Sequence, residues 1–204
     1  ASLLEKKVDP QRVIVTGPPI DPRVIATRKK KQPWRSGPLK LALTTGGLGT
    51  NKNEIRQIMR QLLPELRKRP EPYHLLVYAG THDDICHLAE KMAKEARVAV
   101  GRFDDPTAKL RIIYHPQIMD ANELLIKYGF PWADGFITKP SGDMAYDAVA
   151  SGSFLLTLDE WGEWEHNIRR NFAEKGIARK AVVKEIVPQL EALTQAQNKN
   201  QSWV

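Results

Sequence analysis

Residues 39–66 read LKLALTTGGLGTNKNEIRQIMRQLLPEL, and this stretch decides the fold. Its first six residues form a mostly apolar run of the kind found in strands that are buried on both faces. The glycine-rich turn TGGLG follows at 45–49, and apolar residues then recur at helical spacing over 55–66. Strand, glycine-rich turn and amphipathic helix, in this order, indicate the first unit of a parallel α/β sheet.

The same alternation continues along the chain. Short apolar runs predict further strands at 75–79, 98–100, 110–114, 135–138 and 154–158. Apolar residues at helical spacing predict helices at 85–96, 121–128, 142–152, 164–175 and 181–193. We therefore expect an α/β domain with a Rossmann-like parallel sheet and helices on both faces. Such sheets bind ligands at the carboxyl ends of their strands, so every candidate site is expected along one edge.

We place this domain at 39–194, between an N-terminal segment, 1–38, and a polar tail, 195–204. Residues 12–15 predict a short apolar strand. The prolines that follow enforce an extended or turning path, which is typical of a linker or a crossing between domains. The tail is expected to be frayed.

Composition narrows the class of protein. No apolar run approaches the roughly 18–20 residues that a membrane-spanning helix needs. The single cysteine, Cys86, excludes an internal disulfide and a multi-cysteine metal site, and it suits the reducing cytoplasm. The net charge of +7 favours phosphate-bearing ligands. No zinc-finger spacing or aromatic RNA-binding signature is present, so we expect no nucleic-acid partner.

Much of the positive charge is local, at 28–35 and 67–69. Clusters of this kind are either solvated loops or patches that hold a protein at an anionic membrane surface.

The glycine-rich turn is the first candidate site. Glycines let the backbone approach a phosphate closely, and the start of the next helix favours negative charge. The turn has neither the GxGxxG spacing of dinucleotide folds nor the GK[ST] ending of a P-loop. Glycines at 46–49 fit any tight strand-to-helix turn equally well.

The second candidate is FITKPSGDMAYDAVASG, residues 136–152. It puts Ser141 and Gly142 at the start of a helix, where free N–H groups point beyond the strand. Asp147, one turn further on, can accept hydrogen bonds from two ribose hydroxyls. Alternatively, it complements the helix dipole or pairs with a lysine.

The third candidate is DEWGEWEHN, residues 159–167. Acids and an amide before a helix suit the recognition of sugar hydroxyls, which both donate and accept. The alternative is an acidic first helical turn that stabilises the helix by its charge.

Together the three segments resemble the C-terminal half of the GT-B glycosyltransferases that include monogalactosyldiacylglycerol synthase and the peptidoglycan lipid N-acetylglucosaminyltransferase. The family pattern is KPGG-x-T-x-x-E-A-L-A-x-G followed by G-Q-E-x-x-N. The matching elements here are FITKPSG…D and GEWEHN, and VTGPPI at 15–20 is similar to the segment that enters this half. The resemblance implies a fold that is one half of a GT-B enzyme, with a UDP-sugar as donor substrate.

The resemblance also implies a set of donor-binding residues: Gly46, Gly47, Gly49, Ile118, Ser141, Gly142, Asp143, Met144, Asp147, Glu163, Trp164 and Asn167. It implies that the first three glycines approach the diphosphate or the acceptor edge. It also implies that the backbone at Ile118 recognises uracil, that residues 141–144 line the diphosphate, and that Asp147 accepts hydrogen bonds from the ribose. The last three residues of the set would bind the donor sugar.

Three of these positions depart from the family pattern. Asp147 replaces a glutamate, Met144 a threonine and Glu163 a glutamine. The shorter carboxylate, the lost hydroxyl and the added charge leave open a non-catalytic domain that binds a nucleotide sugar or acts as a scaffold.

The implied activity is inverting transfer of a hexose from the UDP-sugar to a lipid or lipid-linked acceptor, with no cofactor and no metal. Helix N-termini would stabilise the charge on the leaving diphosphate. In the family, the acceptor site and the catalytic base lie in an N-terminal domain, which we expect to be absent here or supplied by a partner chain. We therefore assign no catalytic residue and expect this chain alone to be inactive. We expect it in the cytoplasm, either free or peripheral at a membrane.

Two other enzymes share parts of this pattern. A UDP-sugar 2-epimerase has the same double-domain architecture but needs several acids and bases around the sugar, and no clear set is present. An NAD-dependent dehydrogenase is compatible with the fold alone but requires the glycine fingerprint that is missing here.

Overall fold

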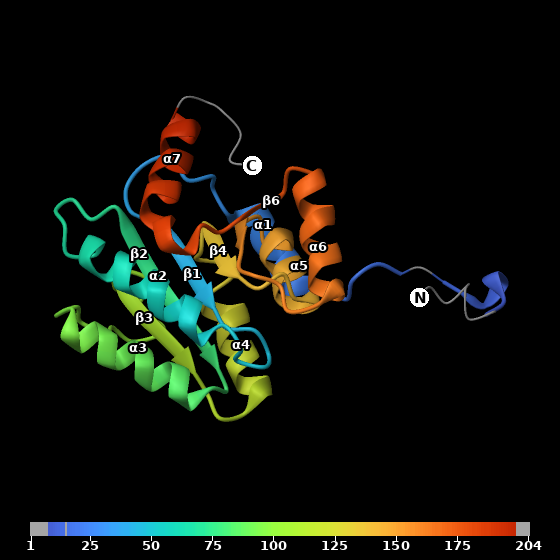
Figure 1. Ribbon diagram of the computed structural model, residues 1–204, viewed down its shortest axis with the longest axis horizontal. Coiled ribbons are helices and arrows are strands. Elements are labelled where there is room, and N and C mark those ends of the chain that lie inside the picture. Colours follow the sequence, from blue (N-terminus) through green and yellow to red (C-terminus); the bar gives the residue numbers. More distant parts are fainter. Residues whose placement is uncertain (1–7, 15, 199–204) are drawn as a thin grey trace.

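The computed structural model describes residues 8–14 and 16–198. A six-stranded parallel sheet lies between two layers of helices (Figure 1). The strands are β1 Leu39–Thr44, β2 Tyr73–Gly80, β3 Leu110–Tyr114, β4 Gly135–Thr138, β5 Phe154–Thr157 and β6 Ala178–Lys180. The helices are α1 Pro22–Lys30, α2 Lys52–Glu65, α3 Asp83–Glu95, α4 Ile118–Tyr128, α5 Gly142–Ala150, α6 Glu163–Glu174 and α7 Ile186–Asn198, with 3₁₀ turns η1 Pro10–Arg12 and η2 Val183–Glu185.

The strand order is β3-β2-β1-β4-β5-β6, with every pair parallel. This is the order of a doubly wound nucleotide-binding sheet, and it reverses direction between β1 and β4. Leu41 of β1 pairs with Gly135 of β4, and the hydroxyls of Thr44 and Thr138 are hydrogen-bonded where the two strands end. The expected Rossmann-like fold class is therefore confirmed.

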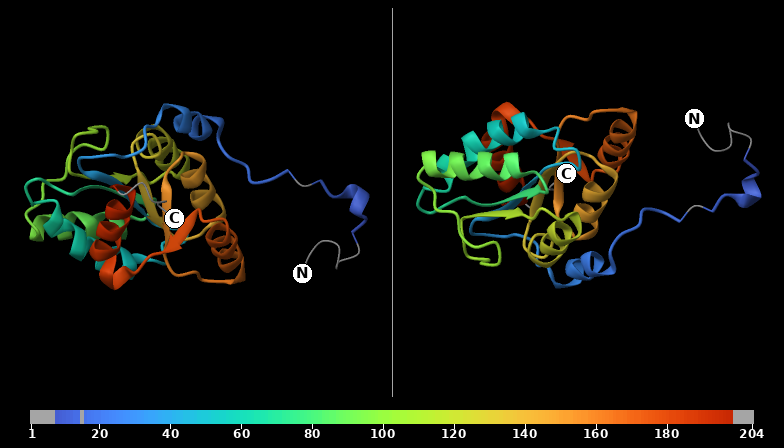
Figure 2. Two further views of the ribbon diagram at one scale, coloured as in Figure 1. Left: turned by 90° about the horizontal axis from the view of Figure 1, so that it is seen from above. Right: turned by 90° about the horizontal axis from the view of Figure 1, so that it is seen from below.

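Alternation along the strands builds one hydrophobic core on each face of the sheet. In β1, Leu39, Leu41 and Leu43 pack with α2, α3 and α7, whereas Ala42 packs with α1, α4, α5 and α6. Figure 2 shows the two helical layers on opposite faces. All four side chains are fully buried, so the sheet is covered on both sides, as parallel sheets require.

Within residues 39–194, one predicted strand is wrong and one real strand was not predicted. Residues 98–100 form a loop, where Val98 is buried but Val100 is 43% exposed. The sixth strand is instead β6, in which only Ala178 is buried. An edge strand with one buried residue lacks the apolar run by which strands are recognised in a sequence.

The N-terminal segment differs from the prediction in two places. Residues 12–14 contain no strand: η1 ends at Arg12, and the chain after it is irregular. Ile14 is 83% exposed, so this apolar residue is not part of a buried strand. Residues 22–30 form α1: the Asp21 carboxylate accepts a hydrogen bond from the Arg23 N–H at 2.7 Å. Residues 1–7 and Val15, which belong to the predicted linker, lie outside the described residues.

Helix α1 is packed against the domain. Pro22 occupies its first turn, a position where the fixed φ of proline favours a helix. Val24 is fully buried in the core beside α5. The chain before α1 extends away from the domain (Figure 1).

At the other end, α7 continues to Asn198, so the first four residues of the predicted polar tail are helical. Residues 199–204 lie outside the described part of the chain. None of the described helices is both long and apolar enough to cross a membrane.

Candidate functional site

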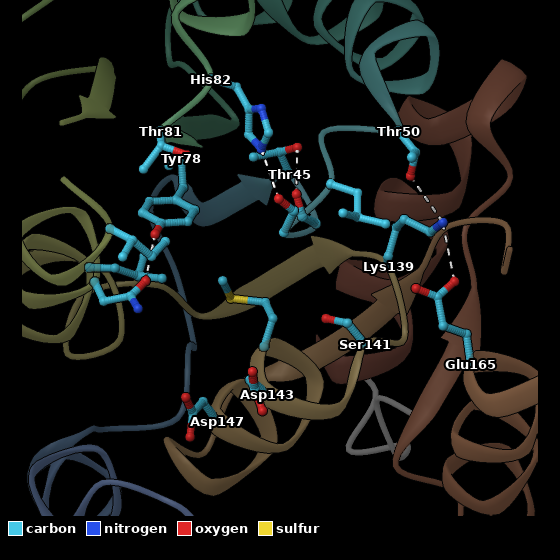
Figure 3. A pocket seen from close by; sticks show the side chains of 18 of the residues that line it. Thr45, Thr50, Tyr78, Thr81, His82, Lys139, Ser141, Asp143, Asp147 and Glu165 are labelled. Atoms are coloured by element: carbon cyan, nitrogen blue, oxygen red, sulfur yellow. Dashed lines mark hydrogen bonds and ion pairs between the residues drawn. The ribbon is translucent and has the colours of Figure 1, made fainter. Parts of the chain in front are cut away.

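A cavity of about 620 Å³ opens where the strand order reverses (Figure 3). Its wall includes the end of β2, the chain segments that follow β1, β2 and β4, and residues of α4, α5 and α6. This is the edge of the sheet at which a ligand site was expected. Of the twelve predicted site residues, seven line the cavity: Gly46, Gly47, Ile118, Ser141, Asp143, Met144 and Asp147.

The glycine-rich turn is held in place by Asn51. Its buried amide donates to the Thr44 carbonyl at 3.1 Å and accepts from the Thr45 hydroxyl at 3.1 Å and the Gly46 N–H at 3.3 Å. Asn51 precedes α2 but makes no side-chain cap bond, because its amide is used by the turn. These bonds fix the backbone of Gly46 at the cavity wall.

Gly49 has a structural role and does not line the cavity. Its φ of +63° is in the left-handed region that favours glycine, and its N–H donates to the Gly46 carbonyl at 2.9 Å. A Cβ at Gly49 would lie 2.8 Å from the His82 ring, whose Nε2 is 3.1 Å from the Gly47 carbonyl oxygen. Any other residue at this position would therefore be strained and would have to displace the His82 ring.

Helix α5 begins beside the turn, with its N-terminus at the cavity. Ser141 is the N-cap and its side chain makes no cap bond. The first N–H groups of a helix have no partner within the helix, so those of α5 are available to a ligand. Gly142 does not line the cavity. A Cβ there would lie 3.3 Å from the Trp164 ring, so this glycine instead lets α6 pack closely.

Asp147 lies one turn further along α5 than Asp143, on the same side of the cavity (Figure 3). Burial, then the nearby charge of Asp143 and finally that of Asp21 raise the pKa of Asp147 to about 6. Within the described part of the chain, no hydrogen bond or ion pair reaches its carboxylate. The alternative of a lysine partner is therefore not observed, and both oxygens can serve a ligand.

Lys139 is a wall residue that sequence reasoning missed. Its side chain is 6% exposed, its Nζ lies 3.1 Å from Glu165 Oε2, and it donates to the Thr50 hydroxyl at 3.3 Å. Among the described residues that line the cavity, it is the only lysine or arginine. An ammonium has three donors, so one is left after these two partners.

The α6 segment contributes different residues from those predicted. Glu163, Trp164 and Asn167 do not line the cavity, whereas Trp161 and Glu165 do. Glu165 also accepts a hydrogen bond from the Trp161 N–H at 2.7 Å, which holds the loop before α6 against the cavity.

The outward residues of α6 have other neighbours. Trp164 is 69% exposed and packs on Gly142. Asn167 accepts a hydrogen bond from Arg170 at 3.2 Å. The sugar-reading role of Glu163, Trp164 and Asn167 stays a prediction, and none of the three lines the cavity.

The opposite wall belongs to α4. Ile118 and Asn122 lie one turn apart on this helix, and the Tyr78 hydroxyl donates to Asn122 Oδ1 at 2.7 Å. Burial raises the pKa of Tyr78 to about 12, so its hydroxyl keeps its proton. The neighbouring wall is apolar and includes Leu125 and Phe130. Sequence reasoning missed both Tyr78 and Asn122, because each lies in an element whose pattern indicates only packing.

Comparison with known proteins gave no match. No family model, curated protein or solved structure was found to be similar to this chain. The resemblance to GT-B enzymes therefore rests on the sequence motifs alone.

The cavity contains groups that can bind an anion, whereas the described residues contain no cluster that could bind a metal ion. No group of three or more His, Cys, Asp or Glu side chains that could hold a metal ion occurs in the described ranges. Groups that can bind an anion do gather there: the turn at 46–47, the start of α5 and the Lys139 ammonium. With two carboxylates nearby to accept hydroxyl protons, the cavity can hold a phosphate and a polyol at the same time.

Proposed function

We propose that this chain is the nucleotide-sugar-binding half of a GT-B type glycosyltransferase and that a UDP-sugar occupies the cavity between β1 and β4. One observation carries the proposal. The point where the strand order reverses joins a glycine-rich turn, an open helix N-terminus and the unpaired carboxylate of Asp147. Doubly wound sheets bind nucleotides at this point.

The diphosphate is proposed to lie between the turn and the start of α5. Gly46 and Gly47 allow a close backbone approach, and a Cβ at Gly47 would meet nothing within 4 Å. The free N–H groups of α5 and the third donor of Lys139 supply hydrogen bonds, of which the charge-assisted one is the strongest. Asp143 and Asp147 repel phosphate, so the diphosphate is favoured at the Lys139 side.

The ribose is proposed to lie against Asp147. Its carboxylate can accept hydrogen bonds from two neighbouring hydroxyls. Burial deprives the carboxylate of hydrogen bonds from water, and a bound diol would supply hydrogen bonds in their place. Aspartate reaches less far than the glutamate of the family, so the ribose would have to lie closer to α5, where Asp147 lines the cavity.

Sugar transfer by direct displacement with inversion would leave negative charge on the diphosphate. The donors aimed at that site, the α5 N–H groups and Lys139, would stabilise this charge as it develops. The acceptor and the base that deprotonates it are assigned to another domain or a partner chain, with no cofactor and no metal proposed.

A lipid or lipid-linked acceptor at the cytoplasmic membrane surface is part of the proposal. Arg28, Lys29 and Lys30 are exposed at the end of α1 and can attract anionic lipid. Lys31 is not available for this, because its ammonium donates to the Ala133 carbonyl and the Ser153 hydroxyl, each at 2.7 Å. Flotation with vesicles containing anionic lipid, which should weaken as salt is added, tests this part.

Calorimetric titration of the chain with UDP tests the central proposal. We expect UDP to bind, and Asp147→Asn to weaken binding about tenfold through the lost hydroxyl contacts. Asp104→Asn is the matched control, since it removes the same charge from an exposed ion pair with Arg102 outside the cavity. Absence of binding at millimolar UDP would refute the proposal.

A non-catalytic nucleotide-sugar-binding domain is the second candidate. Met144, which lines the cavity where the family has a threonine, favours it because no hydroxyl is available there for the phosphates. Binding of a UDP-sugar without hydrolysis or transfer, in the presence of an acceptor domain, would distinguish it from the enzyme.

A further inference from the structure

One end of the cavity is an apolar slot with a single amide at its edge. Leu125, Ile126 and Phe130 contribute apolar wall, and Leu125 and Phe130 are each only 2% exposed. A sugar needs many polar partners, whereas a nucleobase presents apolar faces and a few polar edge atoms. The slot therefore suits a base better than it suits a sugar.

The slot also lies at the correct end for a base. In Figure 3, Tyr78 is on the opposite side of the cavity from Lys139, and Ser141, Asp143 and Asp147 lie between them. A nucleotide whose phosphates are near Lys139 and whose ribose is near Asp147 would put its base beside Tyr78 and α4.

Tyr78 fixes the orientation of the Asn122 side chain. The Tyr78 hydroxyl donates to Asn122 Oδ1 at 2.7 Å, so the oxygen of the amide faces the phenol. The Asn122 nitrogen is then directed away from the hydroxyl, and no other described residue hydrogen-bonds to it. Asn122 lines the cavity, so its amide nitrogen is available to donate to a ligand there, and a donor selects a carbonyl over an amino group.

We propose that Asn122, oriented by Tyr78, is the residue that selects the base, and that it favours a 4-oxo pyrimidine such as uracil over the 4-amino pyrimidine cytosine. The inference rests on the proposed function, because it takes the ligand to be a nucleotide. Uracil accepts a hydrogen bond at position 4, where cytosine donates one. Asn122 is the specificity residue and Tyr78 is a positioning residue.

The test is a titration of the chain with UDP and CDP, and with uridine and cytidine, by calorimetry or NMR. Wild-type protein should prefer UDP to CDP by about tenfold, as expected for one matched against one opposed hydrogen bond. Asn122→Asp replaces the donor by an acceptor and should reverse the preference. Tyr78→Phe frees the amide to rotate, so the ratio should approach one while binding of each nucleotide persists.

Asn171→Asp is the matched control. It makes the same chemical change on α6, away from the residues that line the cavity, and should leave the UDP to CDP ratio unchanged. Circular dichroism shows whether each variant is folded, and if Asn122→Asp is not, Tyr78→Phe carries the test by its loss of discrimination.

Two failures can be told apart. If wild-type protein binds neither nucleotide, the proposed function is wrong and this inference falls with it. If it binds UDP but Asn122→Asp and Tyr78→Phe keep the wild-type ratio, Asn122 does not select the base, and the proposed function stands.

Discussion

Replacing Asp147 by asparagine should stabilise the fold at neutral pH and weaken nucleotide binding. Burial, with Asp143 and Asp21 as smaller contributors, raises the pKa of Asp147 from 3.8 to about 6. This difference corresponds to about 3 kcal/mol, at roughly 1.4 kcal/mol for each pH unit. The folded state binds the proton more tightly than the unfolded state, so ionisation destabilises the fold.

The direction of the pH dependence follows from that difference. Below pH 4 both states are protonated and the carboxyl costs nothing. The cost grows as the pH rises from 4 and is complete above 6. Because Asp147 is only partly buried, the value of about 3 kcal/mol is an upper bound.

Urea unfolding of wild-type protein and Asp147→Asn at pH 4 and pH 7 measures the effect. We expect equal stability at pH 4 and a more stable variant at pH 7, by between about 1 and 3 kcal/mol. Asp143→Asn should reproduce part of the gain by lowering the pKa of Asp147. A variant that is no more stable than wild-type protein at pH 7 would show that ionisation of Asp147 does not destabilise the fold, and Asp147 would then not be the unpaired buried carboxylate that the proposal requires.

Three further sets of variants separate binding from folding. Lys139→Met should lower UDP affinity by about tenfold or more, because the ammonium contacts the phosphates, and should leave uridine affinity nearly unchanged. Glu165→Gln removes a carboxylate that competes with the phosphates for Lys139 and should tighten UDP binding. Calorimetry with UDP and uridine measures both effects. Gly49→Ala should destabilise the fold by about 1–2 kcal/mol, because of its positive φ and the crowded ring beside it, while Gly47→Ala should change stability by less than about 0.5 kcal/mol. Thermal unfolding compares these two variants. Asn51→Ala, which removes three buried hydrogen bonds of the turn, should cost about 2–4 kcal/mol in urea unfolding.

Sequence periodicity was sufficient for most of the fold, because most elements bury a full face. The strands β1 to β5 each contain an apolar run, and all five were predicted. Helix α1 was missed because Asp21-Pro22 was interpreted as part of a linker. The same dipeptide is an N-cap residue followed by a first-turn proline, and the hydrogen bond from Arg23 shows that it acts as one.

The site was predictable only where its residues are close in sequence. The turn at 46–47 and the start of α5 are local motifs, and both line the cavity. Tyr78 and Asn122 reach it through the strand order, which no local pattern specifies. Lys139 belongs to the same motif as Ser141, but the motif alone does not show that its side chain lies at the cavity. Trp161, in the loop before α6, and Glu165, on α6, lie one or two positions from the predicted residues, and a motif does not determine helix phase that finely.

The charges on the cavity wall constrain how a nucleotide can enter. Asp143, Asp147 and Glu165 outnumber the single ammonium of Lys139, so the wall as a whole repels a free diphosphate. The ion pair with Lys139 compensates Glu165, and the two remaining carboxylates are on α5. A diphosphate is therefore favoured only near Lys139 and the glycine-rich turn, and the opposite orientation would press it against two acids. The phosphates therefore add to the affinity only in this orientation, and the ribose contact and the apolar slot beside α4 supply the rest.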